Sequence, residues 1–360
     1  MTRPALHIAQ MAKYALADMQ APPGKPLISL SQNESLRPPS PKAIAAAQEV
    51  IAQGALYPDP DWGALRAQLG ALHVLPPQAV LCGAGSLDLI GAIARVYAGP
   101  TRAVLVPAHA YPFFRSAAQM AGARVDLADE DQVTVRVDAL LHAVQSDTGV
   151  VFVANPGNPT GTRISKTELL RLRAGLREDI LLVVDEAYGE FADHLGEPCF
   201  DMVSSGNTVV LRTFSKAYAL AGFRVGWGAF PPEIAAEVRK VLNPNNISGA
   251  AQAAATAAAA DQAYMRESCA LTAAGRDWAV EALRAAGFKA FDSFTNFVLI
   301  DLGDPARAGA ADAALKAEGV FLRPQAGAGL PQMLRMTVGT ETDMQRALDV
   351  LTAWQKGETT

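Results

Sequence analysis

The stretch LRTFSKAYALAGFRVGWG (Leu211–Gly228) places a lysine, Lys216, shortly after Thr208–Leu211, an apolar run that is typical of a buried strand. A lysine at the end of such a strand can have a lowered pKa and act as a nucleophilic amine. The alternative is an ordinary lysine that reaches solvent or pairs with a carboxylate. The residues that the fold brings near Lys216 decide between the two.

Similar β-branched runs recur along the chain and alternate with longer helical patterns. This alternation predicts an α/β fold with βαβ units, in which helices cover both faces of a mainly parallel sheet in three αβα layers. Ligands of such sheets bind at the carboxyl ends of the strands. The expected strands are Ala79–Cys82, Ala103–Val106, Ala123–Leu127, Val150–Ala154, Ile180–Val184, Thr208–Leu211 and Val225–Phe230.

The pattern changes after about residue 240. The alanine-rich segment 248–265 has strong helix propensity, and segments 291–302, 319–324 and 330–339 are typical of strands. We therefore predict a smaller α+β domain at the C-terminal end. The expected division is an N-terminal arm over residues 1–30, a large domain over 31–255 and a small domain over 256–360.

The composition fits a globular enzyme without polyanionic partners. Half of the 360 residues are hydrophobic, the net charge is -5, and the basic residues are scattered, so we expect neither nucleic acid nor an anionic membrane as a partner. The three cysteines have no paired spacing and indicate a reducing compartment. No segment has the apolar block of a signal peptide or membrane span, so we expect a cytoplasmic protein.

Residues 80–97, VLCGAGSLDLIGAIARVY, place a glycine turn between a strand and a helix. Free backbone N–H groups and the helix dipole could hold a phosphate there, although a plain tight turn looks the same. A dinucleotide site is a poorer interpretation, because Gly83 and Gly85 are not followed by the third glycine of that fingerprint. The loop fits a single phosphate.

Two further strand ends carry polar side chains. VVFVANPGNPTG (150–161) ends a strand in a dense turn signal, where Asn158 could offer an amide donor or simply serve the turn. ILLVVDEAYGEF (180–191) places Asp185 after five apolar residues, where an unpaired carboxylate is costly to bury. A specific cation or N–H group near Asp185 is the favoured interpretation, and purely structural partners are the alternative.

An anion site, a deep carboxylate, an amide donor and a reactive amine complement the groups of pyridoxal 5'-phosphate, which are a phosphate, a ring nitrogen, a phenolic oxygen and an aldehyde. The segments NPGNPTG, DEAYGEF and RTFSKAYALAGFRVGWG, in this order and spacing, closely resemble the fold-type I pyridoxal-phosphate aminotransferases. The resemblance runs from near residue 32 to near residue 338.

The resemblance implies a role for each matching residue. Lys216 would form an imine with the cofactor aldehyde and later move the substrate proton, Asp185 would keep the ring nitrogen protonated, and Tyr188 would bond the phenolic oxygen. The catalytic set is thus Lys216, Asp185 and Tyr188. The implied cofactor-binding set also contains Asn158 at the phenolic oxygen, and Ser215, Arg224 and the backbone of Ser86 and Leu87 at the phosphate.

Two tyrosines complete the cofactor site that the resemblance implies. Tyr111, in PAHAYPFF, would stack on the cofactor ring, and the alternative is a tyrosine of the core. Tyr57, in LYPDPDWGALR, resembles the residue that reaches the cofactor phosphate from the other subunit. A homodimer with shared active sites is therefore expected.

Within this family the chain is most similar to the histidinol-phosphate aminotransferase branch, through SQNESLRPPSP, LYPDPDWGALR and FLRPQAGAGLPQMLRMTVG. The resemblance implies that Arg323 and Arg335 hold the substrate phosphate and that Arg335 also takes the carboxylate of glutamate, with Asn33 as a further substrate-binding residue. Two guanidinium groups fit a dianion, and one bidentate arginine fits a carboxylate. The alternative for Arg323 is an ordinary surface residue. The expected substrates are a small-molecule amino donor and a 2-oxo acid acceptor, such as the 2-oxoglutarate/glutamate couple.

The chain also departs from the branch. Leu87-Asp88 stands where the branch usually has Asp-Glu, and the shortened segment before SQNES leaves Tyr14 as the candidate for a substrate-contacting tyrosine. The alternatives are therefore an aminotransferase for aromatic or other amino acids, a decarboxylase or lyase resembling threonine-phosphate decarboxylase, or a non-catalytic effector-binding domain. The histidines show no ligand spacing, so no metal is expected.

Overall fold

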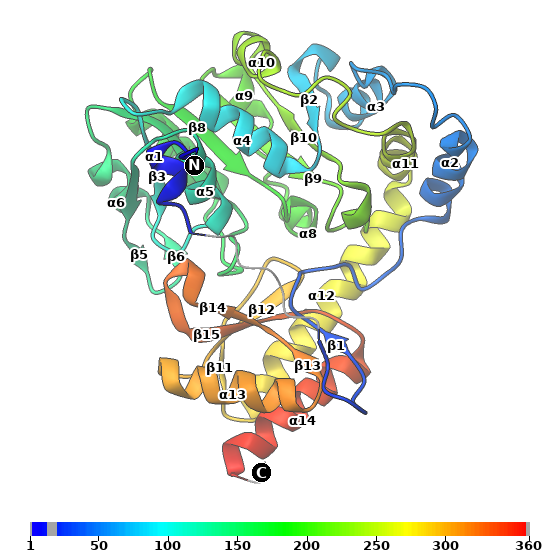
Figure 1. Cartoon of the computed structure of the whole chain (residues 1–360), viewed down its shortest axis with the longest axis vertical. Helices are drawn as coiled ribbons and strands as arrows, with labels where there is room; N and C mark the ends of the chain where they lie inside the picture. Colours follow the sequence, from blue (N-terminus) through cyan, green and yellow to red (C-terminus); the bar gives the residue numbers. More distant parts are fainter. Residues whose placement is uncertain (1, 13–19, 358–360) are drawn as a thin grey trace.

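The computed structural model describes residues 2–12 and 20–357 and contains a large sheet, in the upper part of Figure 1, and a small sheet below it. The large sheet has seven strands in the order β2-β10-β9-β8-β7-β3-β4, and β10 runs antiparallel to both of its neighbours. Each of the seven strands expected for the parallel sheet is in this sheet, so the α/β prediction is confirmed. The strands are β2 (Val80–Gly83), β3 (Ala103–Pro107), β4 (Val125–Ala128), β7 (Thr148–Ala154), β8 (Leu181–Asp185), β9 (Thr208–Thr213) and β10 (Gly226–Ala229).

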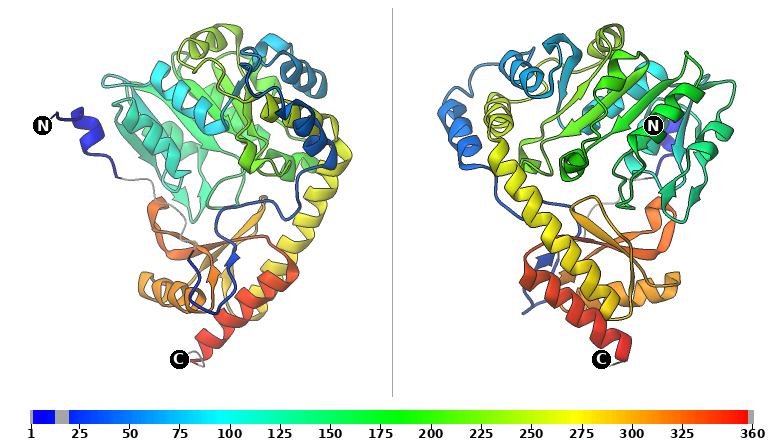
Figure 2. Two further views of the ribbon diagram at one scale, coloured as in Figure 1. Left: turned by 45° about the vertical axis from the view of Figure 1, so that its right-hand side comes forward. Right: turned by 180° about the vertical axis from the view of Figure 1, so that it is seen from behind.

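The central strands are apolar runs without alternation because both of their faces are covered. Every residue of β8 and β9 is buried, and β7 is buried up to its last residue. Helices lie on both faces of the sheet (Figures 1 and 2). The main helices of this part are α2 (Pro41–Ile51), α3 (Gly63–His73), α4 (Ser86–Tyr97), α5 (Pro112–Met120), α6 (Val137–Ala143), α7 (Lys166–Gly175), α10 (Pro232–Arg239) and α11 (Gly249–Ala260).

Short elements fill the connections of this part. Among the described residues they are the helices α1 (Leu6–Ala9), α8 (Gly189–Ala192) and α9 (Asp201–Ser204) and the hairpin of β5 (Glu130–Asp131) with β6 (Thr134–Val135). Helix starts follow local sequence signals: the Ser40 hydroxyl accepts from the backbone N–H of Lys42 where α2 begins, and the Ser165 hydroxyl accepts from that of Glu168 where α7 begins.

The small sheet is antiparallel, in the order β11-β12-β15-β14. Its strands are β11 (Lys289–Ala290), β12 (Phe297–Asp301), β14 (Arg323–Gln325) and β15 (Leu330–Thr337), and the helices of this part are α12 (Gln262–Ala285), α13 (Pro305–Ala317) and α14 (Glu341–Lys356). Leu334 and Met336 of β15 belong to the core that these helices cover. Because side chains alternate along a strand, Arg335 and Thr337 point to the opposite face.

The segment before α2 is bound to strands of the small part of the structure. Strand β1 (Ile28–Ser29) pairs in parallel with β13 (Val320–Phe321), and the backbone N–H of Thr337 donates to the carbonyl of Leu30. Helices α11 and α12 meet at Asp261, and the expected boundary at 255/256 falls inside α11. The division into an arm and two domains remains a prediction.

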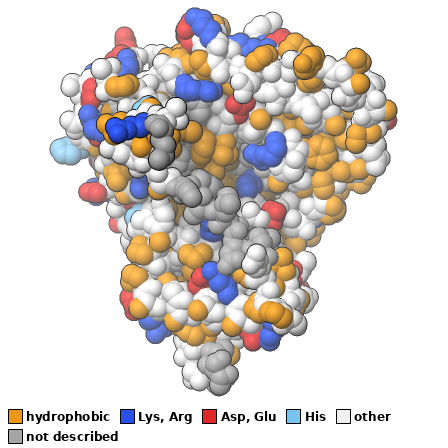
Figure 3. Space-filling model, in the orientation of Figure 1, with side chains coloured by type: hydrophobic (Ala, Val, Ile, Leu, Met, Phe, Trp, Pro, Cys, Tyr) orange, Lys and Arg blue, Asp and Glu red, His pale blue; other side chains and the backbone are white. Residues whose placement is uncertain are grey.

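Charged side chains of both signs are scattered over the face drawn in Figure 3, and the described atoms of this face form no continuous basic patch. A search of the described residues for a helix with the length and apolar character of a membrane span finds none.

Candidate active site

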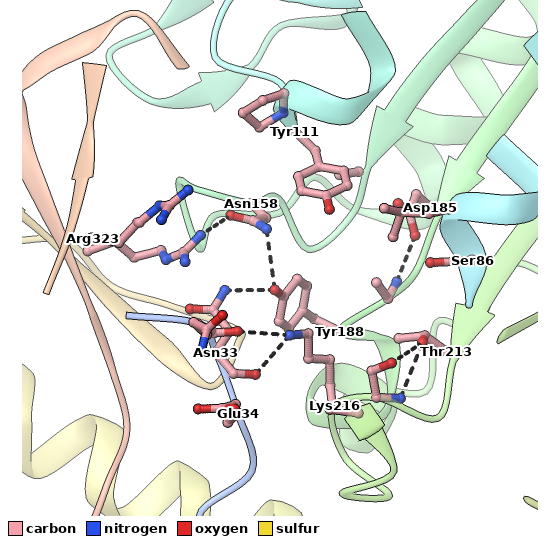
Figure 4. Close-up of a pocket in the computed structure, with 18 of the residues that line it drawn as sticks. Asn33, Glu34, Ser86, Tyr111, Asn158, Asp185, Tyr188, Thr213, Lys216 and Arg323 are labelled. Atoms are coloured by element: carbon pink, nitrogen blue, oxygen red, sulfur yellow. Dashed lines mark hydrogen bonds between the residues drawn. The ribbon is translucent and has the colours of Figure 1, made fainter. Parts of the chain in front are cut away.

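A pocket lies between the carboxyl ends of the large sheet's strands and strands β14 and β15 of the small sheet (Figure 4). This is the edge at which open α/β sheets bind ligands. All predicted site residues except Tyr57 line the pocket: Asn33, Ser86, Leu87, Tyr111, Asn158, Asp185, Tyr188, Ser215, Lys216, Arg224, Arg323 and Arg335.

Lys216 follows β9 and points its amine across the pocket. The Nζ atom donates to the carbonyl oxygens of Asn33, at 2.8 Å, and Gln32, at 3.2 Å. Shielding from water lowers the pKa of Lys216 to about 7, the positive charges of Arg335 and Arg224 contribute, and Glu34 acts in the opposite direction. A substantial fraction of the amine is therefore neutral at pH 7 and can act as a nucleophile.

Asp185 is the last residue of β8, beside β9, and the residue is only 3% exposed. Its Oδ1 atom accepts from the backbone N–H of Ala187 at 3.1 Å. Burial raises the pKa of Asp185 to about 7, opposed by the Ala187 N–H and increased slightly by the charge of Glu186. A carboxylate in this environment is stabilised by a cationic N–H partner in the pocket.

Tyr188 lies in a network of amides (Figure 4). Its hydroxyl oxygen accepts from Nδ2 of Asn33 at 2.8 Å and from Nδ2 of Asn158 at 3.4 Å. The Nη1 atom of Arg335 donates to Oδ1 of Asn158 at 2.6 Å. The carboxyl-edge residues of the large sheet are thus linked directly to β15 of the small sheet.

Residues at the start of α4 and in the turn before β10 line one part of the pocket, where they could hold an anion. Arg224 donates from Nη1 to the Ser215 hydroxyl at 3.3 Å, and Ser86 is the first residue of α4, whose start has no side-chain cap. A Cβ atom on Gly226 would lie 2.1 Å from the backbone nitrogen of Ser86, so only glycine allows β10 to approach this helix end. Gly85 has a φ of +83° and turns the chain into the helix.

The structure also explains the Leu87-Asp88 departure. Leu87 lines the pocket, whereas the Asp88 carboxylate accepts from the backbone N–H of Ala84 at 3.0 Å and from Nδ2 of Asn246 at 2.8 Å. Asp88 therefore stabilises the glycine turn. Asn246 belongs to the polar NPNNISG segment, whose part in holding this turn the sequence did not indicate.

The two tyrosines predicted to complete the cofactor site lie in different places. Tyr111 lines the pocket just before α5, and its ring packs edge-on against Phe114 with 5.8 Å between ring centroids. Tyr57 lies between α2 and α3, outside the pocket, and is 88% exposed. A single chain does not bring Tyr57 to the site.

The two predicted substrate arginines are neighbours. Arg323 of β14 is the cross-strand partner of Arg335 in β15, and both line the pocket. Arg335 is buried and donates from Nη2 to the carbonyl of Ser31 at 2.8 Å. Their proximity fits an anionic ligand. Tyr14 lies outside the described residues.

The sequence did not identify several pocket residues, including Gln32, Glu34 and Thr213. Thr213, the last residue of β9, accepts from the backbone N–H of Ser215 at 3.2 Å and donates to the Ser215 hydroxyl at 3.1 Å. Thr213 ends a buried strand, as Asp185 does, so the sequence contained a signal for it. Glu34 has no such signal, because its position depends on contacts between distant segments.

A cluster of ion pairs lies next to the pocket, around Arg212. Arg212, on β9, donates to the carboxylates of Glu186 and Asp193 at 2.7 to 3.0 Å and lies 3.4 Å from that of Glu190. Glu186 directly follows Asp185, so this cluster fixes the chain next to the Asp185 carboxylate. Among the described residues, no group of three or more His, Cys, Asp or Glu side chains could hold a metal ion.

Comparison with known proteins agrees with this geometry. The family described as Aminotransferase class I and II matches residues 25–351. The histidinol-phosphate aminotransferase of Rhodospirillum rubrum is 42% identical, over 92% of this chain and 91% of the relative. That of Ruegeria pomeroyi is 38% identical, over 92% and 91%.

A solved structure extends the agreement to three dimensions. The crystal structure of histidinol-phosphate aminotransferase from Sinorhizobium meliloti in complex with pyridoxal-5'-phosphate superposes with a TM-score of 0.91 at 27% identity, covering 99% of this chain and 98% of that chain. With the strand-end lysine and aspartate in one pocket and a family match over most of its length, the chain belongs to the aminotransferase class I and II family.

Proposed function

We propose that the protein is a pyridoxal-phosphate-dependent aminotransferase that acts on histidinol phosphate and uses the 2-oxoglutarate/glutamate couple. The observation that carries the proposal is the meeting of Lys216 and Asp185 in one pocket with the adjacent arginines Arg323 and Arg335. The names of three relatives support the same substrate.

The residues of the pocket fit this cofactor. A buried carboxylate with one backbone N–H partner, Asp185, fits a cationic ring nitrogen. The start of α4, with Ser215 and Arg224, fits a phosphate. The Lys216 amine, with its lowered pKa, fits an aldehyde. The relative from Sinorhizobium meliloti contains this cofactor.

In the mechanism, the bound cofactor supplies an aldehyde that captures amines and a ring that withdraws electrons from the substrate Cα. Lys216 would hold the cofactor through its amine and would move the proton at the substrate Cα. In the cofactor-free pocket, burial lowers the pKa of this amine to about 7, which favours both uptake and release of a proton near neutral pH. Asp185 would hold positive charge at the ring nitrogen, and its burial would strengthen this interaction.

The other pocket residues orient the reactants. Tyr188 and Asn158 would hydrogen-bond the phenolic oxygen, and Tyr111 would stack on the ring. Ser215, Arg224 and the backbone of Ser86 and Leu87 would hold the cofactor phosphate. Arg323 and Arg335 would bind the substrate phosphate, and Arg335 alone would bind the glutamate carboxylate. A contact between Asn33 and the substrate remains a prediction.

The proposal includes a homodimer. Tyr57 is exposed, lies outside the pocket of its own chain and is accompanied by exposed Ile51 and Leu56. Exposed apolar side chains close together are typical of a subunit interface. We place this surface at the dimer contact, with Tyr57 reaching the cofactor phosphate of the partner. We also propose that the protein is cytoplasmic, as expected from the sequence.

Loading of the cofactor is expected to depend on pH. Because only the neutral Lys216 amine reacts, the rate at which the cofactor-free protein captures pyridoxal phosphate should fall about tenfold per pH unit below 7 and level off above it. Stopped-flow absorbance measures this rate. Lys216→Ala should abolish capture, whereas Lys25→Ala, which removes an exposed ion pair with Glu318, should not. A Lys216→Ala protein with a normal cofactor spectrum would remove Lys216 from its role.

Asp185→Asn keeps the shape of the side chain but not its charge. We expect this variant to bind the cofactor and to lose turnover by about 100-fold or more, because the ring nitrogen loses its buried charged partner. Single-turnover kinetics with glutamate gives the rate. Asp126→Asn, which alters a carboxylate paired with Arg124 at the sheet edge, is the control and should react normally. A rate within a few-fold of wild type for Asp185→Asn contradicts its role.

Substrate choice is tested with half-reactions. Histidinol phosphate should convert the cofactor faster than phenylalanine or tyrosine does. The Arg323→Met substitution should raise the KM for histidinol phosphate by about tenfold or more, because a charge-assisted hydrogen bond to the substrate phosphate is lost. Glutamate should be almost unaffected by Arg323→Met, because Arg335 takes its carboxylate. Faster reaction with an aromatic amino acid would indicate a different aminotransferase, and release of carbon dioxide without a keto product would indicate a decarboxylase.

Site sharing predicts complementation between subunits. Lys216→Ala and Tyr57→Ala proteins, each impaired alone, should regain part of the wild-type activity when dissociated together and reassembled, because a mixed dimer contains one site with neither change. Sedimentation analysis should give the mass of a dimer for each protein. A fully active monomer would refute the proposed sharing.

A further inference from the structure

The hydroxyl of Tyr188 receives two hydrogen bonds from amides. Nδ2 of Asn33 lies 2.8 Å from it and Nδ2 of Asn158 lies 3.4 Å from it. A tyrosine hydroxyl has two lone pairs and one proton. With both lone pairs engaged by N–H donors, the hydroxyl can interact with any further group only by donating its proton.

The orientation of each amide is fixed by a residue of β15. The Thr337 hydroxyl accepts from the backbone N–H of Asn33 at 2.9 Å and donates to Oδ1 of Asn33 at 3.3 Å. Because the amide oxygen of Asn33 faces this donor, its NH₂ group must face Tyr188. Arg335 orients Asn158 in the same way, through Oδ1.

The backbone and side chain of Asn33 are held in one orientation. The residue is 1% exposed and has a φ of +54°, a conformation that asparagine tolerates better than most residues. Its carbonyl accepts from Nδ2 of Asn296 at 3.1 Å, and its backbone N–H donates to the Thr337 hydroxyl at 2.9 Å. Its backbone is therefore bound on both sides, and its side chain bridges β15 to Tyr188.

We propose that Asn33 and Thr337 are positioning residues that make Tyr188 a hydrogen-bond donor to the phenolic oxygen of the bound cofactor. This proposal rests on the proposed function. It gives a role at the cofactor to Asn33 and Thr337, which are not among the predicted cofactor-binding residues. A bond donated to that oxygen stabilises its negative charge and opposes uptake of a proton beside it. The proton beside the phenolic oxygen should therefore bind at a lower pH in the intact protein than in a protein that lacks Thr337, Asn33 or Tyr188.

The charged groups that line the pocket around Tyr188 come from several elements. Glu34 lies before α2, Asp185 ends β8, Lys216 and Arg224 follow β9, and Arg323 and Arg335 lie on β14 and β15. Exchanging Asn33 or Thr337 for an uncharged residue leaves all six in place. A change in the pH response then reports the polarity of the Tyr188 hydroxyl and not a change in net charge.

The first test compares neutral substitutions in the cofactor-loaded protein. Asn33→Gly removes the amide while glycine accepts the positive φ, and Thr337→Val removes the hydroxyl that orients the amide. Each should raise the midpoint pH of the cofactor's absorbance change by about half a unit to one unit, the equivalent of one ordinary hydrogen bond. Thr337→Ser keeps the hydroxyl and should restore the wild-type midpoint. Unchanged midpoints in both Asn33→Gly and Thr337→Val overturn the inference.

The second test is a double-mutant cycle. If Asn33 acts through Tyr188, Asn33→Gly should add almost no shift in a Tyr188→Phe background, whereas a general packing defect would add its full shift there. An additive shift overturns the inference. Melting temperatures of the cofactor-free variants show that each is folded, and the Thr337→Val and Thr337→Ser pair provides the same comparison if Asn33→Gly does not fold.

Failure of the proposed function can be distinguished from failure of the positioning role. If the wild-type protein does not bind pyridoxal phosphate, measured by absorbance and by quenching of tryptophan fluorescence, the proposed function is wrong and the inference falls with it. If the wild type binds the cofactor and its midpoint is insensitive to Asn33 and Thr337, only the positioning role is wrong.

Discussion

The site depends on an acid and a base that adjacent strands withdraw from water. Asp185 ends β8 and Lys216 follows β9, and burial moves the pKa of each toward about 7. Shielding disfavours the charged form of both groups, so the carboxylate gains from a cationic ligand and the amine becomes reactive. The sheet can place them there because its central strands are covered on both faces and leave only the carboxyl edge open to a ligand.

A second constraint is the alternation of side chains along β15. Leu334 and Met336 anchor the strand in the core of the small sheet, and this anchoring fixes Arg335 and Thr337 on the pocket side. Both polar residues then hydrogen-bond to asparagine amides that converge on Tyr188. The packing of one strand thus sets both the proposed substrate contact and the polarity of a proposed cofactor contact.

Local signals predicted much of the molecule. Each β-branched run expected as a strand of the large sheet is such a strand, because an apolar run between helical patterns has few other stable arrangements in an α/β fold. Asp185, Asn158 and Lys216 were identified by the same logic, since polar residues directly after buried strands gather at one sheet edge. The roles of Tyr111, Arg323 and Arg335 came from family resemblance, and the structure places all three in the pocket.

The sequence by itself determined the strands, the pocket's central acid and amine and the family, because each is encoded by neighbouring residues whose periodicity or spacing is visible in one dimension. Only the tertiary structure decided that Asn33 and Thr337, which are 304 residues apart, share hydrogen bonds and that Lys216 reaches the carbonyl of Asn33. These contacts require the register of β12 with β15 and the pairing of β1 with β13. Register is set by the packing of whole sheet faces, and no short stretch of sequence contains that information.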